Sequence, residues 1–141
     1  MYKNVLLAID LNDDASWQKA LPVAAGFCQT SGGTLHAISV IPDVGMSIVS
    51  SYFPENFEQE VGKKALESLR AFCAEHVPDG IAIQHIIGSG SVYQSILRTA
   101  EDVGADLIVM AAHRPELSDY LLGPNAARVV RHADISVLVV R

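Results

Sequence analysis

Cysteine is scarce in this chain of 141 residues. Cys28 and Cys73 are its two cysteines, and they fall at apolar helical positions without Cys-x-x-Cys spacing. Redox pairs typically show Cys-x-x-Cys spacing, and disulfide frameworks are typical of small secreted domains rich in cysteine. We therefore interpret both residues as reduced thiols in the core of a cytoplasmic protein.

Long hydrophobic runs are also missing. No window of the sequence reaches the length of a membrane-spanning helix, which needs about 20 apolar residues. Residues 2–4 lead straight into an apolar segment with the character of a strand, so we expect no signal peptide. We expect neither membrane insertion nor secretion.

Positive charge is in deficit, with 10 Lys and Arg against 16 Asp and Glu and a formal net charge of −6. Nucleic acids and anionic membrane surfaces attract basic proteins, so neither is expected as a general partner. The chain is 50% hydrophobic and 18% charged, an ordinary globular balance. Together with the length, this predicts one domain over residues 1–141.

Several patterns of metal and catalytic sites are absent as well. The five histidines show no paired spacing of metal ligands, so we expect no metal site built from protein side chains. Ser89 and Ser91 lack a Gly-x-Ser-x-Gly elbow, and Ser91 with Gln94 matches a helix capping box instead. A phospho-receiver domain needs an acceptor aspartate after its third strand, where this chain has Gly88.

What the sequence does contain is a regular alternation of strand and helix patterns. Short apolar runs predict five strands, at Val5–Ile9, Thr34–Ile41, Ile81–Ile87, Leu107–Ala112 and Ile135–Val140. Helical spacing predicts one helix capped by Asp13 or Asp14 and ended by Gly32-Gly33, and others at Glu55–His76, Ser91–Gly104 and Asn125–His132. Residues 43–53 and 88–90 are expected to be loops. This alternation predicts a parallel sheet covered by helices on both faces.

One stretch near the C-terminus organises the expected site. The buried strand ends at His113-Arg114-Pro115, and Gly123-Pro124-Asn125 later opens an alanine-rich helix. A helix start offers unpaired N–H groups and a partial positive charge, so the phosphates of a ligand should lie there. In such sheets ligands bind beyond the C-terminal ends of the strands, which adds Asp10 and residues 40–42 and 88–91. The alternative is a simple turn that starts a helix.

Five segments taken together point to a family: residues 5–10, 104–110, 121–123, 129–133 and 137–140. On them the chain resembles the universal stress protein family over its whole length. It is most similar to the small bacterial subgroup in which His-Arg-Pro replaces the first glycine cluster. The resemblance implies an α/β fold of the adenine nucleotide alpha hydrolase type, a single-domain doubly wound five-stranded parallel sheet of order 3-2-1-4-5 with helices on both faces.

The nucleotide motif of that family is altered here. Nucleotide-binding members carry Gly-x2-Gly-x9-Gly followed by Ser or Thr. In this chain Ala111 and Arg114 stand at the first two glycines, the spacer to Gly123 is one residue shorter, and Pro124 replaces the hydroxyl residue. Pro124 removes one N–H, although it is a good first residue of a helix. Arg114 could offer guanidinium donors to phosphate oxygens.

The resemblance implies a bound adenine nucleotide, ATP or AMP, with or without magnesium. Asp10 would lie near the ribose or a metal ion, and the backbone at Val40 would read the adenine. The remaining expected binding residues flank the nucleotide or surround its phosphates: Met110, Ala111, His113, Arg114, Gly123, Pro124, Asn125 and Ala126. For Asp10 the alternative is a carboxylate that caps the turn after the first strand.

Three functions remain open: a nucleotide-binding stress-response protein that acts as a dimer, a slow ATPase, and a dimeric interaction protein with an empty pocket. A flavin carrier shares the architecture. No strong general base and no dedicated metal cluster appears in the phosphate loop, which argues against a dedicated enzyme. The dimer is expected through Ile135–Val140, an apolar edge strand without charge or proline that invites antiparallel pairing about a two-fold axis. A monomer with this edge covered by residues 43–53 is the alternative.

Overall fold

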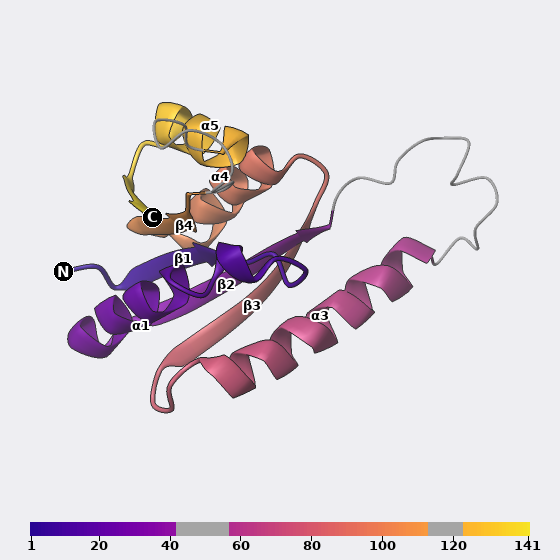
Figure 1. The fold of residues 1–141 in the computed structure, drawn as a ribbon, viewed down its shortest axis with the longest axis horizontal. Helices are drawn as coiled ribbons and strands as arrows, with labels where there is room; N and C mark the ends of the chain where they lie inside the picture. The colour runs from indigo at the N-terminus through magenta and orange to yellow at the C-terminus, as the bar shows by residue number, and fades with distance from the viewer. Residues whose placement is uncertain (42–56, 113–122) are drawn as a thin grey trace.

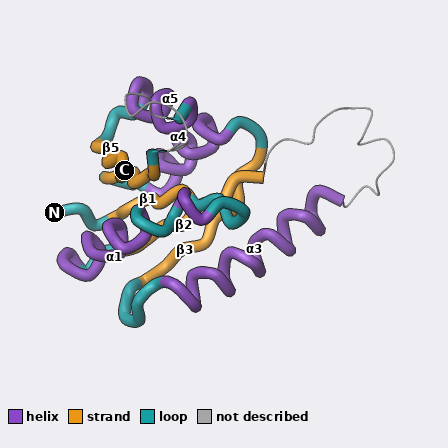
Figure 2. Tube along the Cα trace, in the orientation of Figure 1, coloured by secondary structure: helices purple, strands orange, loops and turns teal. Residues whose placement is uncertain are grey.

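The protein is described by a computed structural model over residues 1–41, 57–112 and 123–141, without the side chains of residues 57–59. Figure 1 shows the chain as a ribbon, and Figure 2 separates its helices, strands and loops. The loop predicted at residues 43–53 lies outside the described residues. So do His113 and Arg114.

The centre of the fold is a five-stranded parallel sheet. Its strands are β1 (Asn4–Ala8), β2 (Thr34–Ile41), β3 (Ala82–Ser89), β4 (Leu107–Ala111) and β5 (Ser136–Val140). They lie in the order β3-β2-β1-β4-β5, and every neighbouring pair is parallel. The predicted strand order 3-2-1-4-5 is confirmed. Parallel neighbours require a crossover each, which the intervening helices supply.

Helices cover both faces of this sheet. They are the 3-10 turn η1 (Asp14–Ser16), α1 (Ala20–Ser31), α3 (Phe57–His76), α4 (Val92–Val103) and α5 (Pro124–His132). α1 and α3 pack on one face, where Leu21 and Leu69 meet the alternate strand residues Val5 and Leu7. α4 and α5 pack on the other face, for example through Ile96 and Val129 against Leu6 and Ile108. This is the doubly wound arrangement that the alternation predicted.

The strands begin and end within one residue of prediction, and β2 matches it at both ends; the exception is the end of β3, which runs to Ser89. Gly88 and Ser89 were expected in a loop and are paired with Val40 and Ile41 instead. Because β2 runs to Ile41, its pairing with β3 continues through Ser89. A Cβ on Gly88 would come 3.1 Å from Cβ of Ser95 on α4, so the glycine lets that helix pack closely on the strand.

The first helix was predicted as one element, and that prediction is wrong. Asp13 accepts a hydrogen bond from Ala15 N and caps only η1, and α1 begins later, at Ala20. Pro22 gives the physical reason: it has no N–H for the carbonyl four residues earlier, and its ring clashes there. In α1 as observed, Pro22 lies in the first turn, where no such bond is needed. Gly32 ends α1 with a φ of 70°, as expected.

The capping box at the start of α4 was also wrong. Ser91 occupies the N-cap position but makes no capping hydrogen bond with its side chain. Gln94 Nε2 donates to the Tyr93 hydroxyl at 3.4 Å, and Ser95 Oγ donates to the Ser89 carbonyl at 2.9 Å. The Ser95 hydroxyl therefore ties α4 to the end of β3.

Both cysteines are buried free thiols, as predicted. No helix in the described ranges is long and apolar enough to cross a membrane. His36 is buried, and its ring nitrogens lie in hydrogen-bond reach of Gln84 and Asn4.

Candidate functional site

A cavity of about 640 Å³ opens at the C-terminal ends of the central strands. The strand order reverses there, because β1 is followed by β2 on one side and by β4 on the other. The residues that line it come from β1 and the loop after it, β2, α3, α4, β4 and the start of α5: Ala8, Ile9, Asp10, Leu11, Asn12, Asp13, Ser16, Ile38, Ser39, Val40, Ile41, Ala65, Ser68, Val92, Met110, Ala111, Gly123, Pro124, Asn125 and Ala126. This is where doubly wound sheets bind ligands.

The loop after β1 is held by Ser16. Its hydroxyl accepts a hydrogen bond from Asp10 N (2.9 Å) and donates to Asp10 O (3.0 Å), so the backbone of Asp10 is fixed from both sides. Asp10 Oδ1 accepts from Asn12 N at 3.0 Å. The turn-capping role weighed for Asp10 is therefore present. Only one carboxylate oxygen takes part in it, and the side chain remains exposed at the cavity.

The backbone of Val40 faces the cavity because β1 is shorter than β2. Backbone groups of a strand point alternately to its two neighbours, and Thr34 N donates to Lys3 O and Ile9 N to Ile38 O, both at 2.8 Å. Val40 is the next residue of β2 that faces β1, which has already ended at Ala8. No described residue of the β1 side makes a backbone hydrogen bond with Val40. One N–H donor and one C=O acceptor are thus presented to a ligand.

The start of α5 supplies further donors. Gly123 is the N-cap and is buried, and Pro124 occupies the first position of the helix. The first hydrogen bond of the helix runs from Ala127 N to Gly123 O at 3.0 Å. Asn125 and Ala126 therefore have N–H groups without a partner inside the helix, and Pro124 has none to give. Two backbone donors and the positive end of a helix lie at this end of the cavity.

The charged side chains in the described lining of the cavity are all acidic. Its described lining includes the carboxylates of Asp10 and Asp13 and contains no lysine, arginine or histidine. The described residues also contain no group of three or more His, Cys, Asp or Glu side chains that could hold a metal ion. The wall around Ile38, Val40 and Val92 is apolar. A ligand that fits has an apolar body at one end and an anionic group at the other.

The structure brings together eight of the ten site residues expected from the sequence. Asp10, Val40, Met110, Ala111 and residues 123–126 all line the same cavity. Sequence reasoning missed Ser16, and also Ala65 and Ser68 of α3. Serines and alanines give no signal of a binding role in a sequence. Only the contact of Ser16 with Asp10 and the packing of α3 against the sheet reveal these residues.

The comparisons with known proteins show which family the chain belongs to. The model of the universal stress protein family matches residues 1–141. The chain belongs to the universal stress protein family. It is 31% identical to universal stress protein G of Escherichia coli O157:H7 over 143 aligned positions, which span 100% of both proteins.

Solved structures of the family share the fold. A universal stress protein crystallised in complex with cAMP has a TM-score of 0.62 and 24% identity, covering 99% of this chain and 97% of its own. The universal stress protein from Archaeoglobus fulgidus in complex with dAMP has a TM-score of 0.60 and 18% identity, covering 99% and 98%.

Proposed function

We propose that this universal stress protein binds an adenine nucleotide, ATP or AMP, in the cavity at the ends of β1, β2 and β4 and acts as a nucleotide-dependent regulatory protein. The observation that carries the proposal is the pair of opposed backbone anchors. At the apolar end Val40 offers an N–H and a C=O that have no backbone partner among the described residues of the β1 side, and Asn125 and Ala126 offer N–H groups at the other end. The cAMP and dAMP complexes of related folds support the choice of ligand class.

Val40 favours adenine over guanine for a chemical reason. The amino group of adenine is a donor, and the ring nitrogen beside it is an acceptor, so the base is complementary to one C=O and one N–H. Guanine presents the reverse order on the same edge. The apolar side chains of Ile38, Met110 and Val92 would cover the faces of the base.

The phosphates are assigned to the start of α5. Unpaired N–H groups and the helix dipole stabilise an anion there, and Gly123 lets it approach the backbone closely. Asp10 would accept hydrogen bonds from the ribose or bind a magnesium ion that the phosphates bring with them. Ala111, Pro124 and the undescribed His113 and Arg114 remain predicted contacts.

Titration calorimetry with ATP, with and without magnesium, tests the proposal. We expect a dissociation constant in the low-micromolar to millimolar range, which corresponds to a binding free energy of about −8 to −4 kcal/mol. Gly123→Val places a side chain against the phosphates and should abolish binding, while its circular dichroism stays that of the wild type. Guanosine nucleotides serve as the control ligand. No heat with ATP up to millimolar concentration would refute nucleotide binding.

Hydrolysis of a bound nucleotide should be slow. The described lining holds no histidine or lysine that could activate water, and Asp10 is already engaged by Asn12 N. We expect turnover far below the ~10 per second that is the median for dedicated enzymes. A rate near that median, retained through purification controls, would contradict this assignment and make Asp10 the first candidate base.

We also propose that the protein works as a homodimer that pairs β5 with its copy. β5 is an edge of the sheet, hydrogen-bonded only to β4 among the described strands. Its residues 137–140 are partly buried valines and a leucine. An edge of this kind presents unpaired N–H and C=O groups, and a two-fold pairing closes it.

A further inference from the structure

The described lining of the cavity leaves the charge of the outer phosphates unmatched. It contains two carboxylates and no basic side chain. The helix start at Asn125 and Ala126 offers two N–H groups, enough for one phosphate group but few for a chain of three. The helices α4 and α5, which both begin at the cavity, carry cationic side chains at Arg98, Arg128 and Arg131.

Arg128 is such a side chain. Its Cζ lies 5.3 Å from the centroid of the Tyr93 ring, a cation–π contact. Tyr93 also stacks on His132 with ring centroids 6.0 Å apart, so the tyrosine lies along α5 beside both residues. No ion pair of Arg128 with another described residue is present, and its guanidinium is exposed. The stacked guanidinium keeps its N–H groups available in its own plane.

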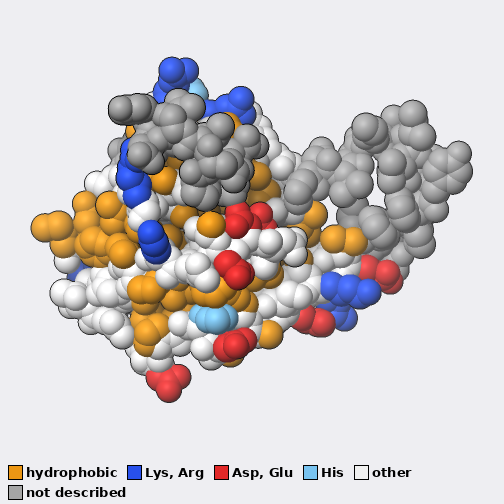
Figure 3. All heavy atoms as spheres, in the orientation of Figure 1, with side chains coloured by type: hydrophobic (Ala, Val, Ile, Leu, Met, Phe, Trp, Pro, Cys, Tyr) orange, Lys and Arg blue, Asp and Glu red, His pale blue; other side chains and the backbone are white. Residues whose placement is uncertain are grey.

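The Arg128–Tyr93 pair lies beside the cavity by its position on two helices. Tyr93 directly follows Val92, and Arg128 is one turn beyond Asn125; Val92 and Asn125 both line the cavity. Long side chains of a helix lean toward its N-terminus, which for Arg128 is the phosphate end of α5. Figure 3 shows Lys and Arg side chains gathered over α5, while acidic side chains occupy the middle of the same face.

We infer that Arg128, held over Tyr93, binds the outer phosphates of a nucleoside di- or triphosphate in the cavity and so sets the preference for ATP over AMP. This inference rests on the proposed function. The base and first phosphate are bound by the backbone of Val40 and of residues 125–126. Arg128 adds a bidentate donor for the phosphates that extend beyond the helix start.

Titration calorimetry with adenosine, AMP and ATP on wild type and variants tests the assignment. Arg128→Gln should lower the affinity for ATP by about tenfold, which is the effect expected from the loss of one charge-assisted hydrogen bond at a partly exposed site. The affinities for adenosine and AMP should change by less than about twofold. Tyr93→Leu removes the ring beneath the guanidinium and should weaken ATP by about threefold, whereas Tyr93→Phe keeps the ring and the affinity.

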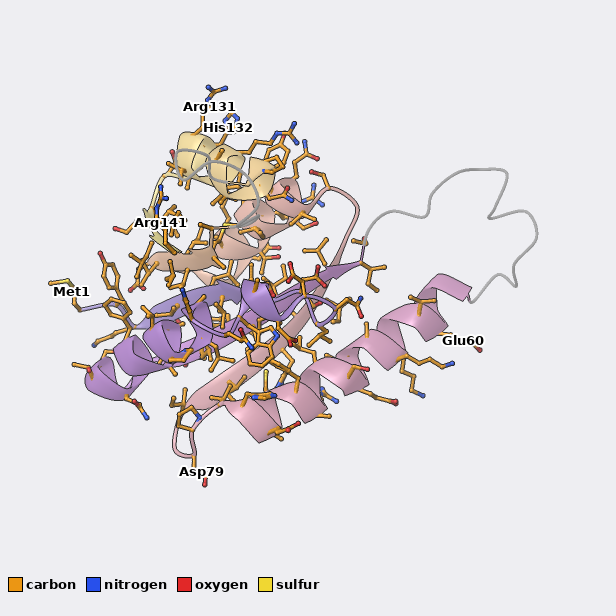
Figure 4. All side chains as sticks on the ribbon, in the orientation of Figure 1. Met1, Glu60, Asp79, Arg131, His132 and Arg141 are labelled. Carbon is orange, nitrogen blue, oxygen red and sulfur yellow. The ribbon has the colours of Figure 1, made fainter. Side chains whose placement is uncertain are left out.

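Arg131→Gln is the matched control. Arg131 lies on the same helix, is exposed, and points away from the body of the molecule in Figure 4. Unchanged ATP affinity in this variant, with the loss in Arg128→Gln, supports a specific contact. An equal loss in both variants, an equal loss for adenosine, or no loss in Arg128→Gln overturns the assignment. A wild type that binds neither ATP nor adenosine refutes the proposed function itself, and the role of Arg128 with it.

Discussion

Gly33, in the turn between α1 and β2, has no room for a side chain. A Cβ on Gly33 would lie 2.3 Å from the Lys3 carbonyl oxygen, far inside van der Waals contact. In the same turn, Thr34 N donates a hydrogen bond to Lys3 O at 2.8 Å. The backbones of β1 and of the α1–β2 turn therefore touch directly, and a side chain at Gly33 would separate them.

Gly33→Ala should accordingly lower the free energy of unfolding by about 1–3 kcal/mol, the usual range for overpacking, and urea denaturation measures it. Gly26→Ala is the control, because it lies within α1 with nothing within 4 Å of its added Cβ. That variant should be as stable as wild type or more stable by up to about 1 kcal/mol. Equal midpoints for wild type and Gly33→Ala would contradict the close approach.

The two thiols should be unreactive in the folded protein. Burial raises the pKa of Cys73 to about 11. Burial, and secondarily the negative charge of Asp106, raises the pKa of Cys28. Because the thiolate is the reactive form, Ellman's reagent should modify neither at neutral pH until guanidinium chloride is added, and then both. Rapid modification of either thiol in the native protein would show that this face of the core opens.

At the scale of elements, the start of α5 combines a stabilising residue with a lost donor. Proline is already set in the helical conformation at the first position, but it contributes no N–H to an anion. The same chain thus has a well-formed helix start with two donors where a serine or threonine would add a third N–H and a hydroxyl.

Pro124→Ser should therefore bind ATP more tightly by about threefold to tenfold, as one or two added hydrogen bonds would give. It should also lose about 0.4–1 kcal/mol of stability, because proline restricts the unfolded chain. Pro22→Ser is the matched control: it is an exposed proline in the first turn of α1 and lies outside the cavity lining. It should lose stability without any change in ATP affinity. Weaker ATP binding in Pro124→Ser would show that the proline itself contacts the ligand.

At the scale of the whole molecule, the sheet has two edges, β3 and β5. The apolar side chains of β5 divide between the two cores: Leu138 packs on the α1–α3 side and Val137 on the α4–α5 side. Val139 is partly buried and is absent from both sets of packed residues. A strand with apolar residues on both faces and one open edge is the natural place for a second copy.

Light scattering at micromolar concentration should report twice the chain mass of 15.1 kDa. Val139→Lys places a charge beside the pairing edge and should shift the population toward monomer. Val130→Lys is the control, since Val130 is 47% exposed and belongs to α5, not to the pairing strand. A wild-type mass of 15.1 kDa would refute the dimer, and dissociation by both variants would indicate an unspecific effect of charge.

The sequence by itself determined the parallel sheet, its layers and, to within one residue, most of its strand limits. Buried strands such as Leu107–Ala111 are continuous apolar runs, and glycines at Gly32 and Gly104 end their helices with positive φ, so the local chemistry and the fold agree. It also pointed to Asp10 and to Gly123 at the strand ends, because a parallel α/β sheet places its ligand site there.

Only the tertiary structure decided what depends on neighbours distant in the chain. β3 continues through Gly88 because β2 is there to pair with it, and the capping pattern at Ser91 gives way to the bond between Ser95 and Ser89. The backbone of Val40 has no partner among the described residues of the β1 side because the pairing of β1 with β2 ends at Ala8 and Ile38, two residues before Val40. Such features arise from the relative lengths of adjacent strands and the packing of helices on them, and neither quantity is encoded in a local pattern of residues.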